Sequence, residues 1–177
     1  MIINKKQAEA VNIKLQQGNI VEFESDVLVY STNLKLLMGG GVGAALMDKY
    51  GYDAQKCLYD SFDNSGSEKT KLGNIFDCKT EAMPWKKVLH TIATDEDYVT
   101  DTKTVENILR ESLSICELTH GVSRLSMSAL GCGYGNLKHE QFIEVLKNVS
   151  TEFKGTDLKE IIVVCDNSND LERMKNA

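Results

Sequence analysis

Two glycine clusters constrain this chain most, because each stands directly between a strand-like segment and a helix-like segment. The first, at residues 38–45, reads Met-Gly-Gly-Gly-Val-Gly-Ala-Ala, and the second, at residues 131–135, reads Gly-Cys-Gly-Tyr-Gly. The run Val-Leu-Val-Tyr at residues 27–30 precedes the first cluster, and such continuous β-prone runs are typical of strands buried on both faces. The two clusters therefore indicate loops that lead from strands of a parallel sheet into helices.

Apolar runs and helical patterns alternate along the rest of the chain. Short β-prone runs predict strands at residues 11–17, 27–30, 74–79, 88–93, 125–130 and 161–165. Helical spacing predicts helices at residues 42–50, 53–62, 105–116, 142–149 and 171–175. Gly51 and Gly121 stand where helices would end. This alternation predicts a three-layer α/β domain with a mostly parallel central sheet.

The size and charge of the chain limit its organisation and its partners. A chain of 177 residues can bury a core without disulfides or metal ions. Twenty Lys and Arg residues against twenty-six Asp and Glu residues give a net charge of −6. This charge argues against general nucleic-acid binding, which relies on neutralising phosphates. We expect one domain over residues 1–177, and a monomer.

The cysteines and the N-terminal residues indicate a cytoplasmic protein. The cysteines are odd in number and widely spaced, without a C-x-x-C pair, which fits neither a zinc site nor a disulfide framework. They are Cys57, Cys78, Cys116, Cys132 and Cys165. Residues 1–6 lack the apolar core of a signal peptide, and no apolar stretch is long enough to span a bilayer. We therefore expect reduced thiols, no metal site and no membrane segment.

The glycine clusters have the chemistry of a phosphate site. Glycine permits positive φ and exposes backbone N–H groups, and the start of the following helix adds partial positive charge. Both loops would lie at the carboxyl edge of parallel strands, where α/β domains bind ligands. Two such loops predict a ligand with two linked phosphates; the alternative is that the glycines only form tight turns. Neither loop has the Walker pattern or the G-x-G-x-x-G spacing.

Five segments, in order, resemble the macrodomain family. Gly-Asn-Ile at residues 18–20 resembles the family's G-D-I, and Asp-Val-Leu-Val-Tyr-Ser-Thr-Asn at residues 26–33 resembles its D-A-I-V-N-A-A-N. The leucine pair and glycines at residues 36–42, the strand at residues 88–92 and the loop at residues 129–135 continue the match. The resemblance spans about residues 11–166. It implies an α/β/α domain with a mixed, mostly parallel sheet that binds ADP-ribose or an ADP-ribosylated protein, with ADP-ribose as ligand or product and no other cofactor.

The resemblance also implies roles for particular residues. Asn19 would accept a hydrogen bond from the adenine amino group, Ile20 would flank the adenine, and Asn33 would contact the distal ribose. Asp166 follows the last strand, where many macrodomains carry an aromatic residue that stacks on adenine. A hydrogen bond between the ligand and Asp166 or Asn167 would compensate for the missing stacking. The two loops would hold the pyrophosphate and distal ribose through Gly39, Gly40, Gly41 and Val42, and through Gly131, Cys132, Gly133, Tyr134 and Gly135.

Several of these residues have plainer interpretations. Asn33 would stabilise a turn, and Tyr134 would be a packed surface aromatic instead of closing over the ribose. We expect His90 to be a strand residue with a satisfied ring and His139 to be solvated at a helix start. For Cys132 we prefer a backbone donor role to that of a reactive nucleophile.

Hydrolysis at the distal ribose is the alternative function, on ADP-ribosyl protein, O-acetyl-ADP-ribose or ADP-ribose 1″-phosphate. One hydrolytic branch of the family has an Asp where this chain has Gly43. Another has a Lys and an Asp where this chain has Gly40 and Gly135. Asn33 is no strong base, so a phosphate-oriented water, with Asn33 and Tyr134 positioning the ribose, would hydrolyse more slowly. A third hypothesis is a fold-mate that recognises another nucleotide or an RNA base run.

Overall fold

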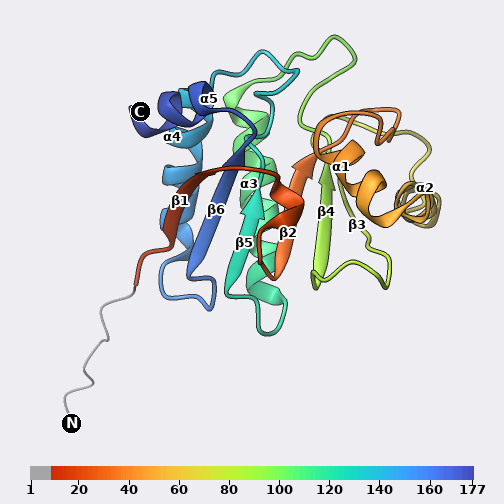
Figure 1. The fold of residues 1–177 in the computed structure, drawn as a ribbon, viewed down its shortest axis with the longest axis horizontal. Coiled ribbons are helices and arrows are strands. Elements are labelled where there is room, and N and C mark those ends of the chain that lie inside the picture. The colour runs from red at the N-terminus through yellow and green to blue at the C-terminus, as the bar shows by residue number, and fades with distance from the viewer. Residues whose placement is uncertain (1–8) are drawn as a thin grey trace.

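The structure of the chain is a computed structural model that describes residues 9–177 (Figure 1). Residues 1–6, on which the signal-peptide interpretation rests, lie outside the described part. The strands are β1 (Asn12–Gln17), β2 (Val27–Ser31), β3 (Ile75–Asp77), β4 (Lys87–Thr91), β5 (Arg124–Met127) and β6 (Glu160–Cys165). The helices are α1 (Gly41–Tyr50), α2 (Asp53–Asn64), α3 (Thr102–Leu118), α4 (His139–Ser150) and α5 (Ser168–Lys175), with 3-10 turns η1 (Ile20–Glu22) and η2 (Thr151–Phe153).

The six strands form one mixed, mostly parallel sheet, as predicted. Their order is β1-β6-β5-β2-β4-β3. Only β3 is antiparallel to its neighbour, β4. The other five strands therefore end at the same edge of the sheet, at the top of Figure 1.

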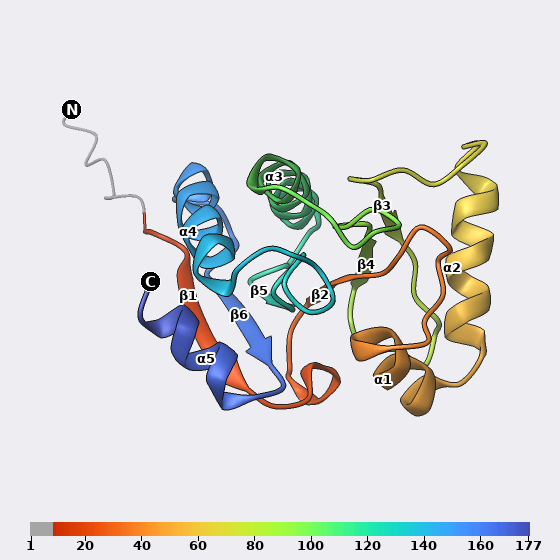
Figure 2. The same cartoon turned by 90° about the horizontal axis from the view of Figure 1, so that it is seen from above.

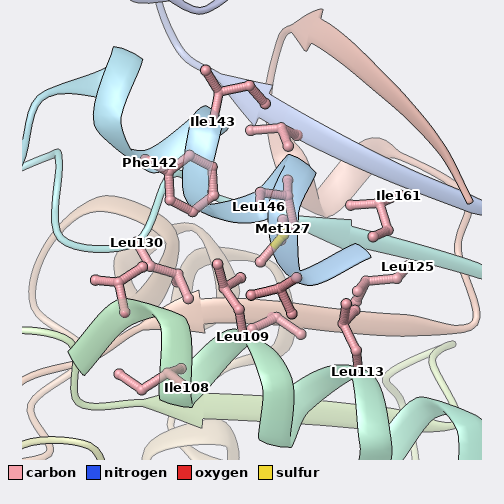
Figure 3. Packing of buried hydrophobic residues seen from close by; sticks show 14 of the residues in the cluster. Ile108, Leu109, Leu113, Leu125, Met127, Leu130, Phe142, Ile143, Leu146 and Ile161 are labelled. Carbon is pink, nitrogen blue, oxygen red and sulfur yellow. The ribbon is translucent and has the colours of Figure 1, made fainter. Parts of the chain in front are cut away.

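Helices cover both faces of the sheet (Figure 2). Strand β2 is buried on both faces: Val27 and Val29 join the core under α3 and α4, whereas Leu28 and Tyr30 join the core under α1 and α2. Figure 3 shows side chains of α3 and α4 packed together with those of β5 and β6. Helix α5 packs against α4 and β1.

Most predicted elements are confirmed, and the differences lie at the ends of strands and the starts of helices. The predicted strand at residues 125–130 ends at Met127, because the chain turns away after a last pairing of the Ser128 N–H with the Val29 carbonyl at 3.2 Å. The predicted strand at residues 74–79 is a three-residue edge strand. The final helix begins earlier than predicted, since Asn167 caps it by accepting from the Asp170 N–H at 3.0 Å. Gly51 ends α1 with φ 79°, as expected.

The amino edge of the sheet is organised by Asp26. Its carboxylate accepts from the N–H groups of Ser123 at 2.8 Å and Arg124 at 3.0 Å, with the Lys86 ammonium 3.7 Å away. Burial alone would raise the pKa of Asp26, but these hydrogen bonds and the Lys86 charge bring it below its ordinary 3.8. Asp26 thus lies at the opposite end of β2 from the carboxyl edge.

We expect Asp26→Ala to lower the free energy of unfolding by about 2 kcal/mol, since it leaves two N–H donors without their charged acceptor. The pKa of Asp26 in the folded protein lies below its ordinary 3.8. The stabilisation by the Asp26 carboxylate is therefore present above pH 3.8 and is lost as the pH falls further. Chemical denaturation of both proteins at pH 7 and at about pH 3 measures the difference. An equal deficit at both pH values would contradict the role of the charge.

Within residues 9–177, no helix combines the length and apolarity needed to cross a membrane.

Candidate functional site

A cavity of about 900 Å³ lies at the carboxyl edge of the sheet. Its walls come from the ends of β2 and β6 and from the segments that follow β1, β2, β4 and β5. Every predicted binding residue except Cys132 lines it: Asn19, Ile20, Asn33, Gly39, Gly40, Gly41, Val42, Gly131, Gly133, Tyr134, Gly135 and Asp166. The structure therefore brings both glycine loops to one trough. Contact of these residues with a ligand stays a prediction.

The first glycine loop presents the start of α1 to the cavity. Gly40 is the N-cap residue, and no side chain caps the helix. The first N–H groups of a helix have no partner within it, so those of α1 remain to bind an anion. Gly41 has φ 53°, a left-handed conformation that favours glycine.

The second glycine loop is a closed turn whose shape requires glycine. Gly131 has φ 77°, and its carbonyl accepts from the Leu137 N–H at 3.1 Å. A Cβ on Gly135 would lie 2.1 Å from the Gly131 oxygen, so no side chain fits there. Within residues 9–177, the N–H groups of Gly133, Tyr134 and Gly135 have no acceptor. This loop therefore offers backbone donors opposite α1.

Tyr134 spans the space between the two loops. A Cβ on Gly40 would lie 3.2 Å from the Tyr134 hydroxyl. The Tyr134 side chain is 76% exposed, and its ring centroid lies 6.1 Å from that of Tyr98. It is therefore not packed into the protein surface, and its closing over a ribose stays a prediction.

The Asn33 amide holds a turn. Its Oδ1 accepts from the N–H groups of Lys35 at 3.1 Å and Leu37 at 3.2 Å, and its Nδ2 donates to the Leu37 carbonyl at 2.7 Å. The turn-stabilising interpretation of Asn33 is thus confirmed. Asn33 still lines the cavity, but three hydrogen bonds limit its freedom to orient a reacting group.

The part of the cavity beside the ends of β1 and β6 is lined by Asn19, Ile20 and two carboxylates. Asn19 Oδ1 accepts from the Val21 N–H at 3.3 Å and so caps η1, an element that the sequence did not predict. The Ile20 N–H has no acceptor within the described residues, as expected for a donor to a ligand. Asp166 and Asp170 both line this part.

The prediction that His139 is solvated is wrong. His139 does open α4, but it is only 9% exposed and lines the cavity. Its Nδ1 lies 3.5 Å from the Asp170 carboxylate. Helix α5 packs against α4 and brings Asp170 over its start, which buries His139. The sequence did not indicate this contact, because the predicted final helix began three residues later, at residue 171.

Cys132 lies outside the cavity. Its side chain is buried in the core under α3 and α4, and its N–H donates to the Ala129 carbonyl at 3.2 Å. Burial raises the pKa of its thiol to about 12. A reactive nucleophile requires a thiolate, so the structure argues against both roles considered for Cys132.

His90 has a satisfied ring, as predicted. Its Nε2 donates to the Cys78 carbonyl at 3.0 Å, so its Nδ1 accepts from the Tyr30 hydroxyl at 2.6 Å. Burial lowers the pKa of His90 to about 4 and raises that of Tyr30. Both rings are therefore neutral at pH 7 and fix the wall of the cavity that Tyr30 lines.

The structure has no room for acidic side chains at the two positions where the resemblance implies them in hydrolytic branches of the family. A Cβ on Gly43 would lie 2.9 Å from the Met38 Cα, and Gly135 is closed off by the Gly131 carbonyl. The carboxylates that line the cavity, Asp166 and Asp170, belong to the segment after β6, and neither glycine loop contains one. The described residues also hold no cluster of His, Cys, Asp or Glu side chains fit for a metal ion.

Several residues that line the cavity had no predicted binding role, among them Thr94, Tyr98, Ser128, His139 and Asp170. Thr94 and Tyr98 follow β4, Ser128 follows β5, and His139 and Asp170 come from α4 and α5. The rule that ligands bind at the carboxyl ends of parallel strands points to Thr94 and Ser128. For Tyr98, an aromatic residue inside an acidic loop was the available signal.

Comparisons with known proteins agree with this geometry. The family described as Macro domain matches residues 29–146. An ADP-ribose glycohydrolase of Archaeoglobus fulgidus is 23% identical over 163 residues, which cover 87% of this chain and 85% of that protein.

Two solved macrodomains share the fold. That of Oceanobacillus iheyensis, solved with ADP, has 21% identity and a TM-score of 0.79, over 93% of this chain and 88% of that one. That of Trypanosoma brucei, solved with ADP-ribose, has 18% identity and a TM-score of 0.75, over 97% and 75%. The predicted α/β/α fold is therefore confirmed.

Proposed function

Because the chain belongs to the Macro domain family, we propose that it binds ADP-ribose, or an ADP-ribosyl group on a larger molecule, between its glycine loops. One observation carries this proposal: backbone N–H groups without protein acceptors face one cavity of about 900 Å³ from two loops. Such N–H groups bind phosphate oxygens. Two facing sets suit a pyrophosphate. The macrodomain of Trypanosoma brucei, solved in complex with ADP-ribose, has the same fold.

The charges of the cavity favour one orientation of the ligand. Asn19 and Asp166 follow the neighbouring strands β1 and β6, whereas the first glycine loop follows β2, on the far side of β5. Carboxylates repel phosphate and accept hydrogen bonds from amino and hydroxyl groups. The nucleoside would therefore lie near Asn19 and Asp166, and the distal ribose near Tyr134.

Titration calorimetry with ADP-ribose, AMP and NAD tests the proposal. ADP-ribose should bind, and AMP, which lacks the second phosphate and the distal ribose, should bind at least about ten-fold more weakly. Equal affinity for AMP would show that the two loops do not hold a pyrophosphate. Absence of ADP-ribose binding at millimolar ligand would refute the function.

Asn19→Ala should weaken ADP-ribose binding by about 1 kcal/mol, or roughly five-fold, because the adenine amino group loses an acceptor. Asn19→Asp is the matched variant: it keeps an oxygen that caps η1 and adds charge assistance, so it should bind at least as tightly as the wild type. Calorimetry measures both. An unchanged dissociation constant in Asn19→Ala would remove this assignment.

Hydrolysis at the distal ribose is the second candidate, favoured by the name of the Archaeoglobus fulgidus relative, ADP-ribose glycohydrolase. The two glycine loops themselves offer Tyr134 and backbone donors but no carboxylate or histidine. Any hydrolysis would depend on a water oriented by the ligand's phosphate. Incubation with mono-ADP-ribosylated protein, followed by detection of released ADP-ribose, separates the two functions. Release that Tyr134→Phe abolishes would establish the enzyme.

A further inference from the structure

Exposed apolar side chains gather at the mouth of the cavity. Within residues 9–177, seven large hydrophobic side chains are exposed, and three of them, Leu37, Tyr98 and Tyr134, line the cavity. A fourth, Val99, follows Tyr98 and is 47% exposed. Exposed apolar groups that cluster at one place indicate a binding surface. We call Leu37, Tyr98, Val99 and Tyr134 the apolar rim.

The exposure of Tyr98 is built into the backbone. Tyr98 has φ 61°, which is unfavourable for a residue with a bulky side chain. The Asp95 carboxylate holds the turn by accepting from the N–H groups of Asp97 at 3.0 Å and Val99 at 2.8 Å. Asn136 joins the turn to the second glycine loop, because its N–H donates to the Tyr98 carbonyl at 3.2 Å. Strained residues that surrounding contacts hold in place are typical of binding sites.

The loop that carries Tyr98 is strongly acidic. Residues 95–101, which we call the acidic loop, contain Asp95, Glu96, Asp97 and Asp101 and no basic residue. Glu96 and Asp97 are exposed. The nearest cation along the chain, Lys103, pairs with Glu106 at 3.4 Å. This side of the cavity mouth therefore attracts cations and repels phosphates.

From the apolar rim and the acidic loop we infer that the bound ADP-ribosyl group is attached to a basic polypeptide segment that lies across Tyr98. This inference rests on the proposed function and names its substrate class. Arginine and lysine side chains stack on tyrosine rings and pair with the Glu96 and Asp97 carboxylates. A nucleic acid would bring phosphates to the same carboxylates, which repel them. The distal ribose lies on this side because Tyr134 belongs both to the second glycine loop and to the rim.

The test uses four probes, of which the two peptides have the same length. Two peptides carry one ADP-ribosyl group through a linkage that resists hydrolysis, one flanked by Arg and Lys and the other by Asp and Glu. The third probe is an ADP-ribosylated oligonucleotide, and the fourth is free ADP-ribose. Calorimetry at low and moderate salt gives their dissociation constants. The basic peptide should bind about ten-fold more tightly than the acidic one, and the advantage should shrink at higher salt.

The double variant Glu96→Lys with Asp97→Lys identifies the surface. Neither side chain lines the cavity or makes a hydrogen bond or ion pair within residues 9–177, so the affinity for free ADP-ribose should stay within about two-fold. The preference for the basic peptide should disappear or reverse. The matched control is Glu111→Lys with Glu117→Lys, an equal charge change on exposed positions of α3, which should keep the preference.

Each failure has a separate meaning. If free ADP-ribose does not bind, the proposed function fails. If it binds but the two peptides bind equally, or if the control variant loses the preference as fully as the acidic-loop variant, the inference fails alone. Tighter binding of the oligonucleotide than of the basic peptide would overturn it in favour of a nucleic-acid substrate.

Discussion

Gly133→Glu is expected to lower the affinity for ADP-ribose by at least about 100-fold, because it places a carboxylate among the N–H groups that bind the phosphates. The substitution should leave the fold intact. Gly133 is exposed, its φ lies outside the left-handed region, and an added Cβ would meet no atom within 4 Å. Calorimetry with ADP-ribose and thermal unfolding without ligand measure the two effects.

Gly133→Ala is the control for this variant. It adds the same Cβ without a charge, so both affinity and unfolding temperature should stay near those of the wild type. Loss of binding in both variants would mean that shape at this position, and not charge, decides binding. Normal affinity in Gly133→Glu would show that the second glycine loop holds no phosphate.

The fold could be predicted from the sequence because its signals are local. The run at residues 27–30 is apolar at every position, as a strand buried on both faces requires, and Gly51 ends α1 as its position indicated. The predicted strand at residues 74–79 is longer than the edge strand β3, which spans Ile75–Asp77 and pairs with β4 alone. Strand ends depend on the neighbouring strand, which the sequence of one segment does not contain.

The sequence predicted the part of the site that is formed by backbone groups of the glycine loops. It did not predict the environments of side chains that depend on contacts with distant segments. The glycine loops line the cavity because their residue type sets their backbone conformation. His139 is buried by α5, more than 25 residues further along the chain, and Asn33 hydrogen-bonds to its own turn. Tyr98 is exposed because Asp95 and Asn136 fix its backbone. The Asp170 contact of His139 and the Asn136 contact of Tyr98 join segments that are far apart in the sequence. The hydrogen bonds of Asn33 are local, as its turn-stabilising interpretation predicted.

The closed second loop has no room for the acidic residue that the family resemblance implies at position 135 in one hydrolytic branch. An acidic side chain at Gly135 would need the loop to open, since the Gly131 carbonyl occupies the space of its Cβ. Gly43 is restricted in the same way by Met38. Adding a catalytic carboxylate would therefore require the backbone of either loop to change first. This steric argument favours a binding role over hydrolysis.

Gly135→Ala tests that closure directly and is expected to have the largest structural effect. Its Cβ would lie 2.1 Å from the Gly131 oxygen and 2.8 Å from the Thr94 Cγ2, and backbone atoms cannot yield as a flexible side chain can. The loop must move, which should lower the free energy of unfolding by about 2 kcal/mol. Displaced N–H groups should also weaken ADP-ribose binding by at least about ten-fold.

Gly133→Ala provides the comparison, because it makes the same substitution two residues away in the same loop, where the added Cβ meets nothing within 4 Å. Chemical denaturation and calorimetry should therefore give different results for the two variants. Gly135→Ala should lose stability and ADP-ribose affinity, and Gly133→Ala should keep both. If Gly135→Ala behaves like the wild type in both measurements, the loop is not closed on the Gly131 carbonyl. The steric argument against an acidic residue at position 135 would then fall with it.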